Sequence, residues 1–297
     1  MSEVDSASGD ERNVPTVGDA DATATLETVL ITGCSSGIGR ATAAAFRAEG
    51  WETYATARDV DDLAALADDG CHTDRLDVTD DGDVQRVVDR IEDEHGRLDC
   101  LVNNAGYGQL GPVEDVPVED LHRQFDVNVY GPHRLTRAAL PVMREGDGGT
   151  IVNLSSLSGR VSTPGSGPYA ASKFALEALS DALRVETAPF DVNVVLVEPG
   201  PVDTGFTDRA DDETDGLLRT GAYESLYEVI DDYDVVGPGP ATVAATDVAD
   251  VVVNAASCTN PSARYTVGSL ARAFSYARFL PDGVRDRLYR LTLRLLG

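Results

Sequence analysis

Short apolar runs alternate with longer amphipathic segments along most of the chain, a pattern typical of β-strands that are each followed by an α-helix. The β-branched, apolar runs predict strands at 28–32, 52–57, 72–76, 99–103, 150–154, 192–197 and 265–268. Apolar residues at helical spacing predict helices at 40–49, 80–95, 118–143, 168–186 and 247–258. This alternation predicts the α/β class: a single-domain, doubly wound parallel sheet of about seven strands with helices on both faces.

The two ends of the chain depart from this repeat. Residues 1–26 are acidic and lack apolar periodicity, so we expect a disordered tail ahead of a domain at 27–268. Residues 269–297 are basic, and Val284 and Leu288 begin an apolar repeat at helical spacing. This amphipathic extension could dock on the acidic body, join a dimer or lie on a membrane surface, and the sequence leaves these alternatives open.

Acidic residues dominate the composition. The 297 residues include 51 Asp and Glu against 24 Lys and Arg, which gives a formal net charge of -27. Such a surface repels nucleic-acid phosphates and anionic lipid, so no nucleic-acid partner is expected. Lys173 is the only lysine in the chain. Abundant Asp with almost no Lys indicates, as a hypothesis, a halophile-like surface suited to a high-salt cytoplasm, where counterions screen self-repulsion.

Cysteines and histidines give no sign of a cross-link or a metal. The four cysteines lie far apart without a Cys-x-x-Cys pair, and the four histidines are equally scattered, so neither disulfides nor a metal site is predicted. No window approaches the ~18 apolar residues of a membrane span, and the first residues lack the pattern of a secretory signal. A reducing cytoplasm is the default expectation.

The first predicted strand ends in a glycine-rich turn at 33–39, which opens a helix. Glycines allow the backbone to turn sharply and to approach a ligand, while the N-H groups and dipole at a helix start favour a phosphate. Strand, turn and helix together predict a site for the pyrophosphate of a dinucleotide. The candidate contacts are Gly33, Ser35, Ser36, Gly37, Ile38 and Gly39.

Arg58 stands where an NAD-binding βαβ unit usually carries an acidic residue. It follows strand 52–57, and its guanidinium could pair with a 2′-phosphate while a serine of the glycine-rich turn adds a hydroxyl. NADP(H) is therefore favoured over NAD(H). The alternative is a surface arginine that pairs with Asp59 or Asp61.

Further polar residues follow the other strands at the carboxyl edge of the predicted sheet, where open α/β folds bind ligands. Asp77, after the third strand, either accepts a hydrogen bond from an adenine amino group or starts a turn. Asn128 is an amide within an apolar helical segment, where it would hold a water or distort the helix. The other candidates are Asn104, Ala105, Gly106, Ser156, Pro199, Gly200, Val202 and Thr204.

Tyr169 and Lys173 carry the most specific chemistry. They lie four residues apart in a helix that Pro168 starts well, so both side chains share one helical face. A nearby cation favours the phenolate of a tyrosine, whose unperturbed pKa is about 10, and makes the group a candidate acid or base. The alternative is a Tyr/Lys pair on a solvated helix face.

Over residues 28–268 these motifs resemble the short-chain dehydrogenase/reductase family. They occur in the family's order and spacing: Thr32-Gly33-x3-Gly37-Ile38-Gly39, Asn103-Asn104-Ala105-Gly106, Asn128, Ser156, Tyr169-x3-Lys173 and Pro199-Gly200-x3-Thr204. The glycine spacing is similar to that of the compact branch of the family. Segments 33–37, 54–59 and 169–177 further resemble its 17β-hydroxysteroid and retinol dehydrogenases.

The resemblance implies an NADP(H)-dependent oxidoreductase that interconverts a carbonyl and a secondary or primary alcohol. Tyr169 would exchange a proton with the substrate oxygen, and Ser156 would orient and polarise the carbonyl. Lys173 would lower the pKa of the tyrosine and hold the nicotinamide ribose. Asn128 would keep a water in the proton path.

The resemblance also implies that Thr204 and the backbone near Val202 fix the carboxamide and that 205–240 is a variable substrate segment. Apolar residues in that segment suggest a lid over an apolar substrate, although a helical pair packed on the body fits equally well. A homodimer or homotetramer is expected. Two other functions stay open: a catalytically silent NAD(P)-sensing regulator, and an epimerase or dehydratase on the same fold.

We expect molar KCl to stabilise the protein, because counterions screen the repulsion among its excess acidic residues. Urea unfolding in dilute buffer and in molar KCl measures the effect as a rise in the free energy of unfolding. A free energy that does not rise with salt would contradict the halophile-like hypothesis and leave an ordinary solvated acidic surface.

Overall fold

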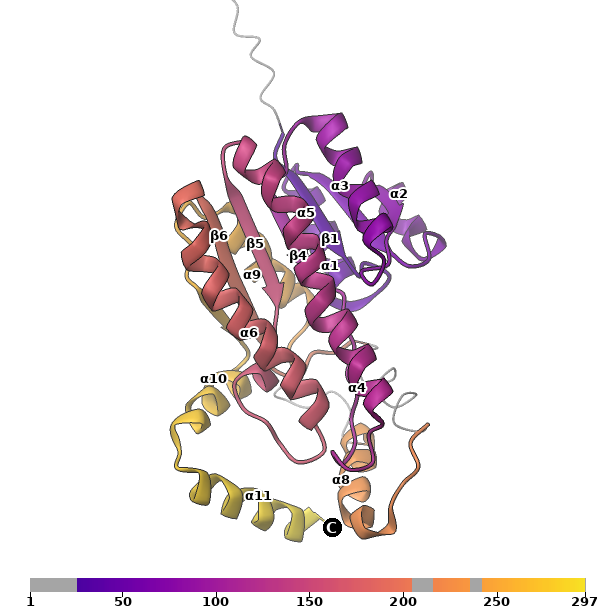
Figure 1. Ribbon diagram of the computed structural model, residues 1–297, viewed down its shortest axis with the longest axis vertical. Helices are drawn as coiled ribbons and strands as arrows, with labels where there is room; N and C mark the ends of the chain where they lie inside the picture. Colours follow the sequence, from indigo (N-terminus) through magenta and orange to yellow (C-terminus); the bar gives the residue numbers. More distant parts are fainter. Residues whose placement is uncertain (1–25, 205–215, 236–241, 297) are drawn as a thin grey trace, which may run out of the picture.

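The computed structural model describes residues 26–204, 216–235 and 242–296, which form a parallel sheet wrapped by helices (Figure 1). The strands are β1 (Thr28–Thr32), β2 (Glu52–Ala57), β3 (His72–Arg75), β4 (Cys100–Asn103), β5 (Gly149–Leu154), β6 (Val192–Pro199) and β7 (Arg264–Val267). They are ordered β3-β2-β1-β4-β5-β6-β7, and each neighbouring pair is parallel. The predicted doubly wound α/β fold with seven strands is confirmed.

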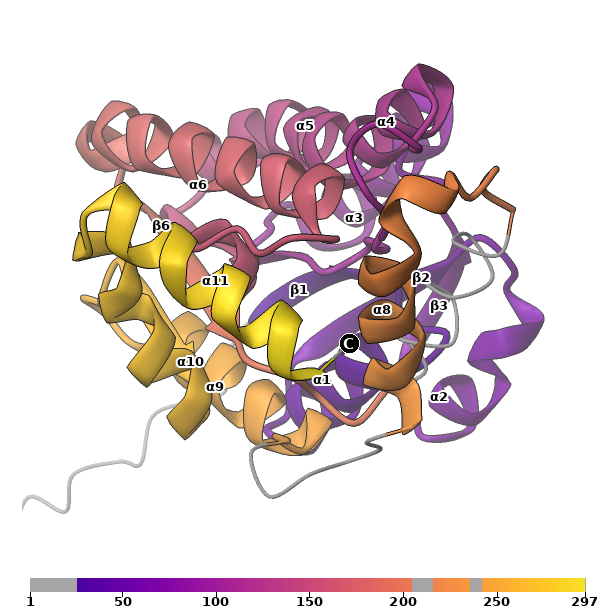
Figure 2. The ribbon, with the colours of Figure 1, turned by 90° about the horizontal axis from the view of Figure 1, so that it is seen from below.

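Helices cover both faces of the sheet (Figures 1 and 2). Phe46 and Val252 pack one apolar core between the sheet and the helices on one face, whereas Ile91 and Leu135 belong to a second core on the other face. The first face carries α1 (Gly37–Ala48), α2 (Ala64–Asp68) and α9 (Ala245–Ser257), and the second carries α3 (Asp81–His95), α4 (Val118–Phe125), α5 (Gly131–Glu145) and α6 (Gly167–Thr187).

The helix predicted at 118–143 is interrupted. A π-helical turn at Asp126–Tyr130 separates α4 from α5, and Asn128 lies within this turn. This wider turn is the local distortion of the helix that the buried amide of Asn128 predicted. The short helical turn Asp61–Leu63 and α2 were not predicted, because they are too short to show a helical period.

A chain of buried amide and hydroxyl groups joins the middle of the sheet to α6. Asn103 Nδ2 donates to Asn153 Oδ1 at 2.8 Å, and Asn153 Nδ2 donates to Ser180 Oγ at 2.8 Å. Because buried polar groups are expensive to leave unpaired, these bonds specify how β4, β5 and α6 align.

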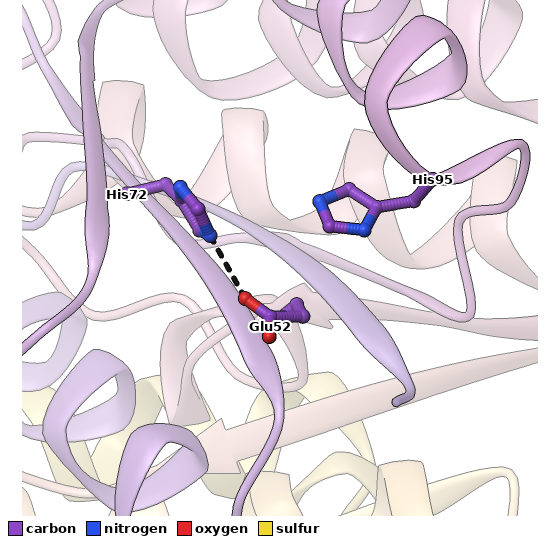
Figure 3. A group of neighbouring side chains, drawn as sticks. All are labelled: Glu52, His72 and His95. Carbon is purple, nitrogen blue, oxygen red and sulfur yellow. Dashed lines mark hydrogen bonds and ion pairs between the residues drawn. The ribbon is translucent and has the colours of Figure 1, made fainter. Parts of the chain in front are cut away.

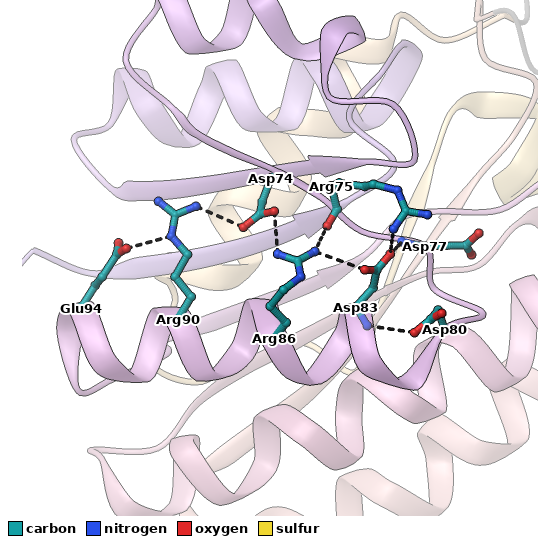
Figure 4. A network of polar contacts seen from close by, with 8 residues as sticks. All are labelled: Asp74, Arg75, Asp77, Asp80, Asp83, Arg86, Arg90 and Glu94. Atoms are coloured by element: carbon teal, nitrogen blue, oxygen red, sulfur yellow. Dashed lines mark hydrogen bonds and ion pairs between the residues drawn. The ribbon is translucent and has the colours of Figure 1, made fainter.

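Ion pairs hold α3 against the edge strand β3 (Figure 4). Asp74 accepts from Arg86 at 2.7 Å and from Arg90 at 3.1 Å, and Arg90 also donates to Glu94 at 2.8 Å. Asp83 accepts from the backbone N-H of Asp77 at 3.1 Å. Since each exposed pair contributes only about 0–1 kcal/mol, this ladder orients the helix more than it stabilises the fold.

The C-terminal extension runs past the carboxyl edge of the sheet. After α10 (Ser269–Ser275), helix α11 (Asp282–Leu296) crosses below the domain and reaches α8 (Glu224–Val235) (Figure 2). Leu288 and Leu291 on α11 remain 49% and 54% exposed. Among the helices that the structure describes, none is both long enough and apolar enough to cross a bilayer. The predicted N-terminal tail lies almost entirely outside the described residues.

Candidate active site

The glycine-rich turn comes so close to its neighbours that side chains are excluded from it. A Cβ atom on Gly39 would stand 2.2 Å from the Gly33 carbonyl oxygen and 2.5 Å from Asn104 Nδ2. Gly33 and Gly37 adopt φ values of 73° and 55°, which strain other residues. The first turn of α1 holds no acidic residue. The turn therefore offers an anion site at a helix start.

Two other residues of the turn contact neighbouring parts of the structure, and one of these contacts comes from a basic residue, Arg40. Ile38 packs against the apolar core, and the carbonyl of Ser35 accepts a hydrogen bond from Arg40. Arg40 also donates to the Asp62 carbonyl at 3.0 Å. Its guanidinium thus bridges the turn and the loop after β2, a role that sequence spacing alone did not indicate.

Asn104 and Thr32 lock the end of β1 to the loop that follows β4. Asn104 Nδ2 donates to the carbonyl oxygens of Thr32 at 2.8 Å and Gly33 at 3.1 Å. Thr32 Oγ1 accepts from the backbone N-H groups of Asn104 and Ala105, both at 3.1 Å. The Asn-Asn-Ala-Gly motif therefore bridges backbone segments at the sheet edge.

Arg58 follows β2 and is exposed. No carboxylate of the described residues lies within 4.0 Å of its guanidinium, so the alternative ion pair with Asp59 or Asp61 does not form. Asp77 Oδ1 accepts from the N-H and hydroxyl groups of Thr79 at 2.9 and 2.7 Å, which is a turn contact. Burial alone would raise the pKa of Asp77, but these bonds and nearby arginine charges lower it.

Asn128 uses its amide to pack the loop after β4 against α6. It is 1% exposed, and its Nδ2 donates to the Tyr107 carbonyl at 2.9 Å and to Ser172 Oγ at 3.1 Å. Its Oδ1 accepts from the Tyr107 N-H at 3.1 Å. A Cβ atom on Gly106 would stand 3.0 Å from Asn128 Oδ1 and 3.7 Å from Lys173 Nζ, so Gly106 keeps this region narrow.

Ser156, Tyr169 and Lys173 come together at the carboxyl end of β5. Ser156 hydrogen-bonds to the Tyr169 phenol, and its Oγ accepts from the Ser158 N-H at 3.1 Å. Lys173 is 6% exposed, its Nζ donates to the Leu154 carbonyl at 2.8 Å, and it lies 5.8 Å from the centroid of the Tyr169 ring. The alternative of a solvated Tyr/Lys pair is therefore wrong, because the lysine points into the protein.

Burial shifts the pKa values of Tyr169 and Lys173 and so sets their protonation states. It raises the pKa of Tyr169 to about 12, although the hydrogen bond from Ser156 lowers that pKa in part. Burial also lowers the pKa of Lys173 to about 8, against the opposing charge of Glu177. Loss of water around the phenol therefore outweighs the interactions that lower the tyrosine pKa, and the lowering expected from Lys173 stays a prediction. At neutral pH Tyr169 holds its proton.

Sequence reasoning missed a buried cluster of charges beside Lys173. Glu177, one helical turn later, and Glu198 of β6 are 5% and 2% exposed. Arg264 donates to Glu177 at 3.0 Å and lies 3.2 Å from Glu198, while Arg160 lies 3.6 and 3.7 Å from the two carboxylates. Burial and the charge of Glu177 raise the pKa of Glu198. Of the contacts in this cluster, only the four-residue spacing from Lys173 to Glu177 can be read from the sequence, because the other members are far apart along the chain.

The segment after β6 reaches the glycine-rich turn. A Cβ atom on Gly37 would stand 3.0 Å from Thr204 Cγ2, so two motifs distant in sequence touch. Val202 forms a bridge with Val243, and the Gly200 N-H donates to the Val267 carbonyl at 3.0 Å. With Pro199 at the end of β6, these contacts place all four predicted residues of this segment at the ligand edge.

Helix α8 lies over the loop that leads into α6. A Cβ atom on Gly165 would stand 2.9 Å from Ile230 Cδ1, and Tyr227 OH donates to Asp115 at 2.7 Å. Thr220 donates to the same carboxylate through its N-H at 3.0 Å. This part of the predicted lid therefore packs on two loops at the mouth of the site, and the rest of the lid lies outside the described residues.

Known proteins share both the sequence and the fold. Residues 27–215 match the short chain dehydrogenase family. The chain is 32% identical over 280 residues to the NADPH-dependent 3-dehydrocapnine reductase of Ornithobacterium rhinotracheale (90% of this chain, 97% of that protein). It is 41% identical over 178 residues to retinol dehydrogenase 5 of Mus musculus (58% and 55%). A crystal structure of a Streptomyces avermitilis short-chain dehydrogenase has a TM-score of 0.75 at 34% identity (89% and 95%). The predicted resemblance is confirmed.

Lys173→Met should remove a pH-dependent penalty on folding. The pKa of Lys173 falls from 10.5 to about 8 on folding, so between these values the unfolded chain binds more protons and stability rises with pH. The penalty is fully present below pH 8 and amounts to about 3 kcal/mol.

Urea unfolding at neutral pH and near pH 10.5 measures this change. We expect the stability of Lys173→Met relative to wild type to be highest at neutral pH and to fall toward pH 10.5. Arg144→Met removes an exposed cation and serves as the control, for which no such trend is expected. A pH-independent difference for Lys173→Met would show that the amine is not desolvated.

Proposed function

We propose that this chain, which belongs to the short-chain dehydrogenase family of NAD(P)-dependent oxidoreductases, interconverts an apolar carbonyl compound and its alcohol with NADP(H). The observation that carries the proposal is the meeting of Ser156, Tyr169 and Lys173 at the sheet edge that also holds the glycine-rich turn. A hydroxyl, a phenol and an amine so arranged can pass a proton to or from a substrate oxygen.

The protonated phenol suits carbonyl reduction. Tyr169, with a pKa of about 12, holds a proton at neutral pH and can donate it to the oxygen of the carbonyl being reduced. Ser156 would orient that oxygen, and the positive charge of Lys173 favours the phenolate left behind. Asn128, beside Ser172 on α6, would hold a water through which the proton is replaced. Hydride transfer is the chemistry that a bound nicotinamide dinucleotide supplies.

The residues around the turn fit such a cofactor. Gly39 has no room for a Cβ atom, and no acidic side chain stands in the first turn of α1, so a pyrophosphate can approach the helix start. Arg58 and Arg40 are exposed cations on this side of the sheet that could pair with a 2′-phosphate. The name of the NADPH-dependent relative also supports NADP(H) over NAD(H).

Two observations support an apolar substrate. One relative is named a retinol dehydrogenase, and retinol is an apolar alcohol. Leu226 and Ile230 of α8 contact the loop ahead of Tyr169, so an apolar helix face borders the site. We therefore propose that α8 belongs to a lid over the substrate.

The exposed leucines of α11 support pairing of two chains or contact with a lipid surface more than docking of this helix on the body of the domain.

Tyr169→Phe should abolish carbonyl reduction, because the proton donor is lost while the ring remains. A panel of ketones, aldehydes and secondary alcohols, assayed with NADPH or NADP, first identifies a substrate for wild type. We expect the variant to lose at least about 100-fold in kcat/KM while NADPH binding stays nearly unchanged. Tyr276→Phe, an exposed tyrosine at 72% exposure, is the matched control. Activity of Tyr169→Phe within tenfold of wild type would remove the mechanism.

Arg58→Gln should weaken NADPH binding selectively. Loss of one charged contact to a phosphate corresponds to about tenfold in the dissociation constant. Fluorescence titration with NADPH and NADH separates the cofactors, and we expect NADH binding to change little. Arg144→Gln controls for loss of an exposed positive charge elsewhere. Equal weakening of both cofactors, or of neither, would assign Arg58 to the surface.

A further inference from the structure

Two histidines that are scattered in the sequence meet a carboxylate at the amino edge of the sheet (Figure 3). Glu52 begins β2, His72 begins β3 and His95 ends α3. One ligand atom from each residue lies within 4.8 Å of the other two. We propose that these three side chains form a binding site for Zn²⁺. The sequence predicted no metal site because no short spacing links the three positions, and only the parallel pairing of β2 with β3 brings them together.

The distances within the cluster suit a zinc ion. His72 Nε2 and Glu52 Oε2 are 2.8 Å apart, and the rings of His72 and His95 meet edge to face with centroids 6.0 Å apart. Zinc binds imidazole nitrogen and carboxylate oxygen at about 2.0–2.2 Å in tetrahedral geometry, which places ligand atoms roughly 3.3 Å from one another. All three side chains are partly exposed, so small rotations can bring them to that separation.

A buried tyrosine supports the two imidazoles from behind. Tyr54 stacks on His72 with ring centroids 4.6 Å apart, and its hydroxyl lies 2.8 Å from His95 Nε2. The same hydroxyl hydrogen-bonds to Glu94. Metal-binding histidines commonly have such partners, which fix the ring orientation and the tautomer. Tyr54 is fully buried, so it provides a rigid support for both rings.

The three side chains of the cluster are partly exposed, so an ion can reach them from solvent. A hollow of about 250 Å³, lined by Leu26, Glu52, Glu94, His95 and Arg97, opens beside the cluster and leaves room for a water as fourth ligand. The nearby guanidinium of Arg97 is held by Asp99 at 2.9 and 3.0 Å. Two imidazoles with one carboxylate select zinc and neighbouring transition metals over Mg²⁺, which prefers oxygen ligands.

The position of the site defines its role. It lies at the amino ends of β2 and β3, whereas Ser156 and Tyr169 follow the carboxyl end of β5, so the ion does not touch the reacting groups. A bound ion would join the edge strand β3 to β2 and to the last turn of α3. The ion would thus be structural. It would stabilise the pairing of β2 with β3 at the amino end of β2, whereas Arg58 follows the carboxyl end of the same strand.

Metal binding to the full chain tests the proposal. Protein without a polyhistidine tag, carrying Cys258→Ser to remove the exposed thiol, is dialysed against ZnCl₂ and analysed for metal. We expect one zinc per chain, a higher Tm with zinc, and tetrahedral Co²⁺ absorption bands on substitution. His72→Gln and His95→Gln should each weaken zinc binding by at least about tenfold, and excess Mg²⁺ should not compete.

The remaining two histidines provide the matched control. His122 on α4 and His133 on α5 are exposed, and the variant that changes both to Gln should bind zinc like the parent. Circular dichroism verifies that each variant is folded. If a histidine variant does not fold, zinc binding to Glu52→Gln, which lacks the third ligand, provides the test instead. Undiminished zinc binding in the folded variants of the cluster, or a parent dissociation constant above about 1 mM, would overturn the proposal.

Discussion

The buried amine of Lys173 is the constraint around which the site is built. A charged group removed from water must find compensating partners, and Lys173 has the Leu154 carbonyl at 2.8 Å and the charge of Glu177 one turn later. These partners belong to β5 and to α6, so strand and helix must keep a fixed alignment. The same alignment brings Tyr169 to Ser156, and the reactive arrangement is a consequence of how the lysine is accommodated.

That accommodation extends deeper into the fold. Glu177 and Glu198 are both buried, and Arg160 and Arg264 lie between them, which connects α6 with β6 and β7. Buried ion pairs add little net stability, but removing one member leaves an uncompensated charge that costs about 3–5 kcal/mol. The cluster therefore fixes the position of the helix that carries the phenol and the amine, and contributes less to the stability of the fold as a whole.

Local sequence patterns revealed the parts of the molecule that depend on near neighbours. The alternation of strands and helices, the glycine-rich turn and the Tyr169/Lys173 spacing are all readable within a few residues. The seven predicted strands are found, and both motifs lie at the sheet edge where they were expected. Features made by distant residues were not readable. The π-helical turn at Asn128 depends on Tyr107 and Ser172, and the ion cluster depends on Arg264.

Burial was the other quantity that the sequence could not supply. The expected direction of the Tyr169 pKa followed from the lysine nearby, but the sign depends on how much water surrounds the phenol. The solvent exposure of Arg58, which forms no ion pair with the part of the chain described by the structure, was likewise not readable from the sequence.

The solitary lysine has a practical consequence for handling the protein. With Lys173 only 6% exposed and no other lysine in the chain, reagents that acylate or cross-link side-chain amines find no accessible target on the surface. Immobilisation or dye labelling through such amines would fail on the folded enzyme. Carboxylates, which crowd the outside, are the natural handles for attaching it to a support.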